Sequence, residues 1–156
     1  MKKSAGMRCV GYARSAVTSA AGPAHDPTET QAEQIKQRCR PFRLLEVLRE
    51  PGRSGNDTDR PQLKKLLRLV RRGRVDAVVV ARVAVLARSP EQFDHLMREF
   101  ERHEVRLISV EDGVDTAGTK GKAKTDAIRA LTRTLRAMDG QRGARANGAS
   151  KHARCA

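Results

Sequence analysis

The stretch Asp76-Ala77-Val78-Val79-Val80-Ala81 decides the fold of this chain. Its side chains are almost continuously apolar and mostly β-branched, which is typical of a strand in a parallel sheet with both faces covered. We therefore predict a central strand over Val75–Ala81. Such a strand requires a crossover helix before it and another after it.

The segments on either side of this strand alternate in the same way between short apolar runs and longer helical patterns. Further strands are predicted at Arg8–Ala13, Arg43–Arg49 and Val105–Glu111. Helices are predicted at Thr28–Arg40, Arg60–Arg72 and Ser89–His103. The order of these elements predicts an α/β domain with a mostly parallel four- or five-stranded sheet flanked by helices.

Two of the helices have recognisable starts. Asp59 is a candidate N-cap for the second helix, with Pro61 in its first turn. Ser89 is the candidate N-cap of the third helix, and Gln92 could complete a capping box there. Apolar residues at helical spacing predict the buried stripes of both helices: Leu63, Leu66, Leu67, Val70, Phe93, Leu96, Met97 and Phe100.

The charge of the chain is strongly positive and uneven. Its 156 residues carry a formal net charge of +14, and residues 116–156 hold 10 Lys and Arg against 2 Asp and Glu. This favours a polyanionic partner, with DNA first, although charge alone leaves an anionic membrane surface open. We predict a domain over 1–122, a basic amphipathic helix over 123–138 and a disordered basic tail over 139–156.

Other features exclude several classes of protein. The cysteines are scattered, at Cys9, Cys39 and Cys155, without the close pairs of a zinc site or a disulfide framework, so we expect a reducing cytoplasm and no metal. The most apolar stretch is interrupted by Arg82, so no membrane span is predicted. His95 and His103 are interpreted as surface residues.

The segment from Gly52 to Leu63 reads Gly-Arg-Ser-Gly-Asn-Asp-Thr-Asp-Arg-Pro-Gln-Leu. This spacing of Gly-x-Ser-Gly, then Asp-Arg-Pro and a Leu-rich helix, resembles the catalytic domain of the serine recombinases, the resolvase/invertase family that cuts and rejoins DNA. Tyr12-Ala13-Arg14 and Arg88-Ser89 follow the family's order, and the resemblance extends from about Arg8 to Lys122. It implies a three-layer resolvase-like domain.

The resemblance also implies a reaction and a set of site residues. In the family, a serine hydroxyl attacks a DNA phosphodiester and becomes linked to the 5′ phosphate, with no metal or other cofactor. Arg14, Arg60 and Arg88 occupy positions where the family places phosphate-binding arginines, since guanidinium groups hold two phosphate oxygens at once. The matching supporting positions are Tyr12, Gln34, Ser54 and Gly55.

The sequence departs from the family pattern at the positions that carry the chemistry. Ala16 stands where the attacking serine is expected, and Ser15 lies one residue early, on the opposite face of a continuing strand. Ala84 and Val85 replace an Asp-Arg pair. Loss of a nucleophile and a transition-state cation together predicts that ordinary catalysis is absent.

The C-terminal region differs from the family as well. Family members continue with a long apolar dimerisation helix and a DNA-recognition region. Here the helix is short and basic, and Arg129, Arg133 and Arg136 share a face that could follow a phosphate backbone.

Three hypotheses follow for the function. The first is a non-catalytic relative of the serine recombinases that binds DNA or assists an active recombinase partner, alone or as a homo-oligomer. The second is an active site-specific recombinase or invertase with Ser15 as nucleophile. The third is a decayed remnant or a protein-interaction module with a solubilising tail.

Overall fold

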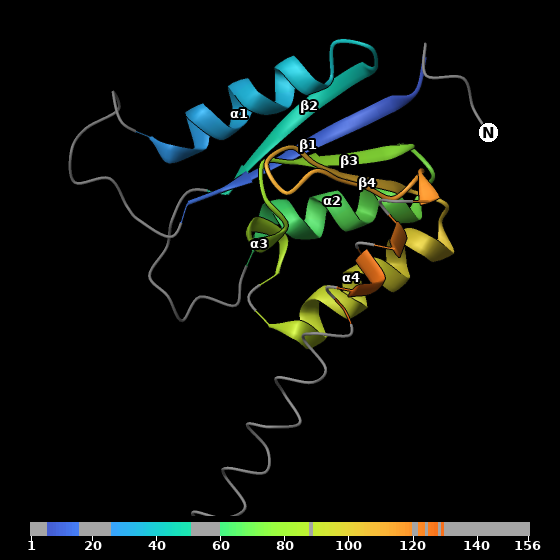
Figure 1. Cartoon of the computed structure of the whole chain (residues 1–156). Coiled ribbons are helices and arrows are strands. Elements are labelled where there is room, and N and C mark those ends of the chain that lie inside the picture. Colours follow the sequence, from blue (N-terminus) through green and yellow to red (C-terminus); the bar gives the residue numbers. More distant parts are fainter. Residues whose placement is uncertain are drawn as a thin grey trace, which may run out of the picture.

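The chain is described by a computed structural model that covers residues 6–15, 26–50, 60–87, 89–119, 122–123, 125–127 and 129. Its strands are β1 (Arg8–Arg14), β2 (Arg43–Glu50), β3 (Ala77–Val80), β4 (Arg106–Ser109) and β5 (Val114–Asp115). Its helices are α1 (Pro27–Arg38), α2 (Pro61–Arg71), α3 (Val83–Leu86) and α4 (Pro90–Arg102). Figure 1 shows their arrangement.

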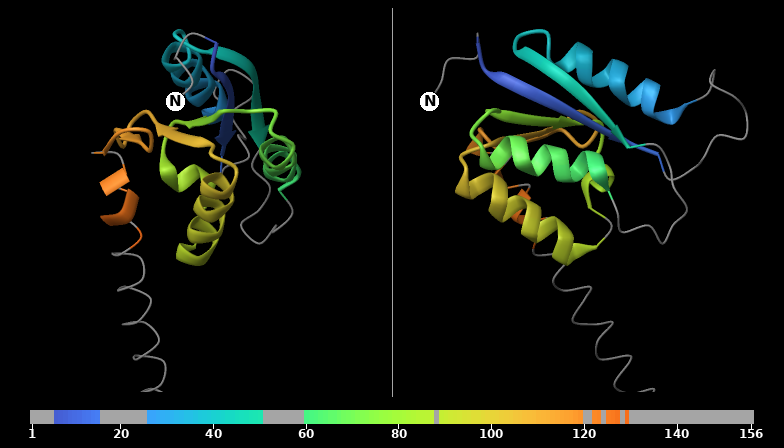
Figure 2. Two further views of the ribbon diagram at one scale, coloured as in Figure 1. Left: turned by 90° about the vertical axis from the view of Figure 1, so that its right-hand side faces the viewer. Right: turned by 180° about the vertical axis from the view of Figure 1, so that it is seen from behind.

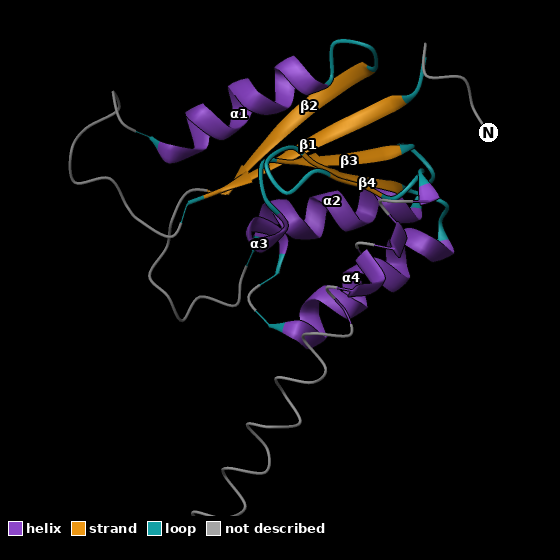
Figure 3. Cartoon of the chain, in the orientation of Figure 1, coloured by secondary structure: helices purple, strands orange, loops and turns teal. Residues whose placement is uncertain are grey.

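The strands form a five-stranded sheet in the order β2-β1-β3-β4-β5. The pairs between β2, β1, β3 and β4 are parallel, and only β5 runs antiparallel, beside β4. Helix α1 covers one face of the sheet, and α2 and α4 cover the other (Figures 2 and 3). The predicted three-layer α/β domain with a mostly parallel sheet is therefore confirmed.

The central strands divide their side chains between two cores because successive residues of a strand face opposite sides. Val10 and Tyr12 of β1 pack with α2 and α4 in one core, whereas Cys9 and Ala13 pack with Ile35 of α1 in the other. All four residues of β3 are buried, as expected for a strand covered on both faces.

Helix α1 can approach β1 closely because Gly11 has no side chain. A Cβ atom at Gly11 would lie 2.6 Å from Cγ2 of Ile35 and 3.1 Å from a methyl group of Val47. Neither distance is an ordinary van der Waals contact, so the glycine sets the distance between α1 and the sheet.

The structure refines the predicted helix starts. Ser89 caps α4 as predicted, because its hydroxyl accepts a hydrogen bond from the Gln92 amide at 3.2 Å. For α2, the N-cap position belongs to Arg60 rather than to Asp59, which lies outside the described residues. The Arg60 side chain makes no capping hydrogen bond, so the free amides of the first turn need another acceptor.

Two short elements were not predicted. Helix α3 occupies four residues directly after β3, and β5 has only two residues. The predicted boundaries at residues 122 and 138 fall where few or no residues are described, so the division of the C-terminal region stays a prediction.

Candidate functional site

The carboxyl ends of the parallel strands meet at one edge of the sheet and leave a cleft of about 460 Å³ there. Arg14 at the end of β1 lines it, together with Gln31 and Gln34 of α1. Ala84 and Val85 of α3 line the opposite wall. Ligands of open parallel sheets bind at this edge, so the cleft is the candidate functional site.

The backbone of Arg14 pairs with β2 on one side and is held by α1 on the other. Strand β3 ends at Val80, opposite Tyr12, so it offers Arg14 no partner residue. The side-chain amide of Gln31 takes its place: its Oε1 accepts from the Arg14 amide at 3.1 Å and its Nε2 donates to the Arg14 carbonyl at 2.9 Å. This pair of hydrogen bonds fixes the carboxyl end of β1 against α1.

Gln34 and Glu111 also line the cleft and contact each other. Nε2 of Gln34 donates to Oε1 of Glu111 at 3.1 Å, and Arg82 pairs with the other oxygen of the same carboxylate. Oε1 of Gln34 is buried and accepts no hydrogen bond from any described residue. Glu111 thus partly neutralises Arg82, the cation that lines the cleft beside α3.

The Arg60 side chain points into the protein, where it is 6% exposed. Its Nε and Nη2 donate to the Tyr12 hydroxyl at 3.1 and 2.7 Å, and the guanidinium lies 5.3 Å from the centre of the Tyr12 ring. Its Nη1 donates to the Leu86 carbonyl at 2.7 Å, and Nη2 also donates to the Val85 carbonyl at 2.9 Å. Arg60 therefore joins β1 to α3 and positions the wall of the cleft.

Tyr12 remains a neutral phenol in this setting. Burial raises the pKa of its hydroxyl, against the opposing effect of the nearby Arg60 cation, to about 12. The neutral hydroxyl accepts from Arg60 and makes a long hydrogen bond, 3.4 Å, to Oε2 of Glu50.

Glu50, the last residue of β2, supplies the acceptor that the first turn of α2 needs. Its Oε2 accepts from the amides of Gln62 at 3.0 Å and Leu63 at 3.1 Å. A carboxylate at this position also favours the positive end of the helix dipole. Tyr12, Glu50 and Arg60 therefore form one buried network, which Arg60 connects to Val85 in the wall of the cleft.

The position of α3 depends on a residue far away in the sequence. Oδ2 of Asp112 accepts from the amide of Val83 at 2.6 Å, across 29 residues of chain, and also lies 2.6 Å from the Ser109 hydroxyl. The sequence contains no local cap for α3, which is why Asp112 was missed. Its position three residues after the last parallel strand was the available signal.

Ser15, the candidate nucleophile, is 6% exposed and follows β1 directly. Its amide donates to the Glu50 carbonyl at 3.4 Å. If the alternation of β1 continues for one residue, Ser15 falls on the α1 face with Ala13, opposite the face of Tyr12 and Arg60.

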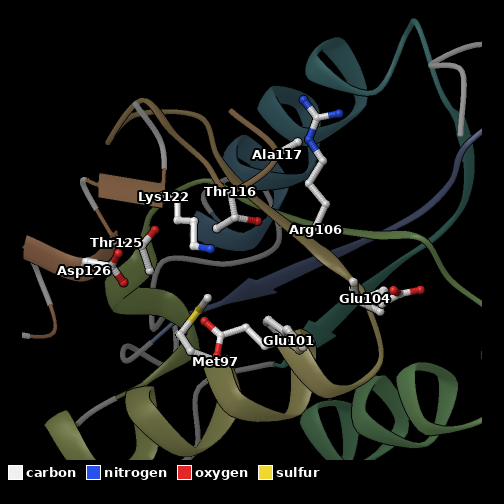
Figure 4. A pocket seen from close by; sticks show the side chains of 11 residues that line it. Met97, Glu101, Glu104, Arg106, Thr116, Ala117, Lys122, Thr125 and Asp126 are labelled. Atoms are coloured by element: carbon white, nitrogen blue, oxygen red, sulfur yellow. The ribbon is translucent and has the colours of Figure 1, made fainter. Parts of the chain in front are cut away.

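Arg129, for which we predict a phosphate contact, lies against α4, and its role toward DNA stays a prediction. Its Nη1 is 2.9 Å from Oε1 of Glu101 and its Nε is 3.5 Å from Oδ1 of Asp94, with 13% of the side chain exposed. Near it, Met97 and Glu101 of α4 lie opposite Lys122 across a pocket of about 280 Å³ (Figure 4). These ion pairs join Arg129 to α4.

Other predicted site residues lie outside the described residues, so their roles stay predictions. These residues are Ala16, Ser54, Gly55, Arg88, Arg133 and Arg136.

Within the described part of the chain, no group of His, Cys, Asp or Glu side chains has the arrangement of a metal site. No helix in that part has the length and apolar character needed to span a membrane.

Comparison with known proteins gives consistent matches. The family model of the resolvase N-terminal domain matches residues 9–154. The transposon Tn917 resolvase of Enterococcus faecalis is 36% identical over 69 residues, which are 44% of this chain and 36% of that protein. A DNA-invertase of Enterobacteria phage P7 is 35% identical over 77 residues, which are 49% of this chain and 40% of that protein. The matches thus span two fifths or less of these relatives.

Solved structures share the fold. A resolvase family site-specific recombinase from Streptococcus pneumoniae superposes with a TM-score of 0.71 at 18% identity, over 91% of this chain and 98% of that one. The N-terminal catalytic domain of TP901-1 integrase gives a TM-score of 0.69 at 19% identity, over 84% of this chain and 98% of that one. At these identities the likeness shows the arrangement of the elements.

Proposed function

This chain belongs to the resolvase N-terminal domain family of the serine recombinases, and from that premise we propose that it acts in DNA recombination as a DNA-binding accessory protein that does not itself cut DNA. The family relationship confirms the resemblance predicted from the Gly52–Leu63 segment and Tyr12-Ala13-Arg14. The accessory role is a proposal about what this member does.

The lining of the cleft carries the proposal. Ala84 and Val85 form part of its wall, at the two positions where the family resemblance implies an aspartate and an arginine. Neither side chain can donate a hydrogen bond or stabilise charge on a phosphate, and stabilising that charge is the main electrostatic demand of phosphoryl transfer.

The contacts of Arg60 and Arg14 also support a protein that binds DNA without cutting it. The hydrogen bonds of Arg60 to Tyr12, Val85 and Leu86 give its guanidinium a positioning role. Arg14 lines the cleft, and we propose that it contacts a DNA phosphate there together with Arg88. Phosphate contacts of this kind position a protein on DNA without reading its sequence.

A plasmid assay tests the proposal. The full chain is incubated with supercoiled plasmid, and nicked DNA and covalent protein–DNA adducts are measured after denaturation. We expect neither product from the natural sequence, and we expect adduct from the triple variant Ala16→Ser, Ala84→Asp and Val85→Arg.

Controls separate the alternatives. An adduct from the natural sequence that disappears in Ser15→Ala would identify an active recombinase and overturn the accessory role. Absence of DNA binding even at low ionic strength would contradict the DNA-binding part and favour a protein-interaction module.

A further inference from the structure

We propose that the exposed side of α2 is a docking surface for the phosphate backbone of double-stranded DNA. We call it the α2 cationic face and define it by Lys64, Arg68 and Arg71. The inference rests on the proposed function in one respect, the class of partner, and it assigns that partner to a surface outside the cleft.

All the charged residues in α2 are cationic. Residues 60–75 contain seven Lys and Arg and no Asp or Glu. Leu63, Leu66 and Val70 turn inward and are buried, so the intervening cations face outward. Lys64, Arg68 and Arg71 are exposed and recur at helical spacing.

Lys64, Arg68 and Arg71 form a row along α2 whose length matches the spacing of several phosphates on a DNA strand. Arg71 lies seven positions after Lys64, which corresponds to roughly 10 Å along a helix axis. A DNA strand presents one phosphate for about every 3.4 Å of its axis, so the row could face about three phosphates.

The surface is concave. Pro61 and Leu67 lie with the three cations around a groove of about 420 Å³. Lys and Arg side chains can lay their aliphatic stems along apolar surface such as Leu67 and keep their charged ends in solvent. The groove therefore combines three cationic side chains with the apolar residues Pro61 and Leu67.

Neighbouring carboxylates neutralise only part of this charge. Lys65 pairs with Glu46 at 2.7 Å, and Arg71 pairs with Glu99 at 2.8 Å. Arg68 makes no salt bridge with any described residue, and the same holds for Arg72 and Arg74 just beyond the helix. Arg68 in the middle of the face, and Arg72 and Arg74 just beyond its end, therefore add cationic charge that no described carboxylate pairs with.

The residue types around this face favour duplex DNA over other partners. Single-stranded nucleic acid is bound by stacking on aromatic side chains, and all four aromatic residues of the chain are buried or half-buried. Protein interfaces use apolar anchors, and the large apolar residue that is exposed in the described chain is Leu45, on β2.

The α2 cationic face is separate from the described residues that follow β5. Figure 2 shows α2 and the segment that contains residues 122–129 on opposite sides of α4. Helix α2 begins beside the cleft, because Arg60, directly before it, binds the carbonyls of α3. DNA on this face would therefore start at the candidate site and extend along the helix.

Fluorescence anisotropy with a labelled duplex of arbitrary sequence tests this surface across a series of salt concentrations. We expect the full-length variant Lys64→Gln/Arg68→Gln to bind about tenfold more weakly than the natural sequence at 0.1 M salt. We expect the slope of log K against log salt to fall in magnitude by about 2, or about 1 for each phosphate contact removed.

The matched control is Arg40→Gln/Arg43→Gln. It removes the same charge from exposed positions outside the α2 cationic face, one in the turn after α1 and one at the first residue of β2. We expect its salt slope to stay near that of the natural sequence. Circular dichroism and thermal melting verify that both variants fold.

The outcomes distinguish this inference from the proposed function. If the natural sequence does not bind duplex at low salt, the proposed function and the inference both fail. If it binds, and the α2 variant and the control bind alike, the α2 cationic face is overturned and the proposed function stands. Equal affinity for single-stranded DNA of the same length would overturn the preference for duplex.

Discussion

The family motif assigns Arg60 to a DNA phosphate, yet the hydrogen bonds of its guanidinium in the described chain are made inside the protein, to Tyr12 and to α3. The Arg60 guanidinium donates to a phenol and to two carbonyls at 2.7 to 3.1 Å, and a buried arginine without such acceptors would destabilise the fold by several kcal/mol. The motif predicts where the arginine lies in the chain. It does not predict the direction of the side chain, which depends on carbonyls of α3 that have no sequence signature.

The titration of Tyr12 provides a prediction at this scale. The chain has one Tyr and no Trp, so absorbance near 295 nm reports this phenol alone. Burial raises its pKa from 10.0 to about 12, so we expect little tyrosinate at pH 11 while the protein remains folded.

The same shift gives a stability prediction with a definite sign. Between pH 10 and 12 the folded state binds more protons than the unfolded state, so the free energy of unfolding falls as pH rises through this range. A titration midpoint near 10 with unchanged circular dichroism would contradict the buried position of Tyr12.

At the scale of elements, helix α2 is capped from outside its own segment. Substitution of Glu50 by Gln removes the carboxylate that accepts from the amides of Gln62 and Leu63. We expect a loss of about 1 to 2 kcal/mol in the free energy of unfolding, measured by urea titration with circular dichroism.

The control for Glu50 lies on the same strand. Glu46 makes an exposed ion pair with Lys65, so Glu46→Gln should cost about 0.5 kcal/mol or less. Equal losses in the two variants would show that the capping contacts of Glu50 add nothing to stability.

The packing of α1 on the sheet is tested at Gly11. An added methyl group would meet Ile35 at 2.6 Å, so we expect Gly11→Ala to destabilise the protein by about 1 to 3 kcal/mol as α1 is displaced. Gly118→Ala is the matched control, because a Cβ there meets no atom within 4 Å. Thermal melts of the two variants should differ clearly, and similar melts would contradict the close approach.

The elements that could be predicted from sequence are those whose signals are local. β3 and α4 follow from the apolar run Ala77–Val80 and from Ser89 with Pro90, since strand burial and helix capping depend on neighbouring residues. α3 could not be predicted in this way, because its first turn is held by Asp112 from 29 residues away.

At the scale of the whole molecule, the sequence locates the candidate site and leaves its geometry open. Topology alone brings the ends of β1 and β3 to one edge, so Arg14 and Ala84 could be expected near each other. The partners that orient these residues, such as Gln31, make contacts between segments that no motif joins. The net charge of +14 likewise predicts a polyanionic partner without predicting that α2 carries an uncompensated share of that charge.

The pairing of Gln31 with the backbone of Arg14 has a consequence for local motion. The amide hydrogen of Arg14 is shielded by a side chain of α1, whereas the amides deeper in β1 are shielded by neighbouring strands. Deuterium uptake at Arg14 should therefore follow the opening of α1 and precede that of the sheet interior. We therefore expect the carboxyl end of β1 to open together with the surface helix α1, and more readily than the rest of the strand.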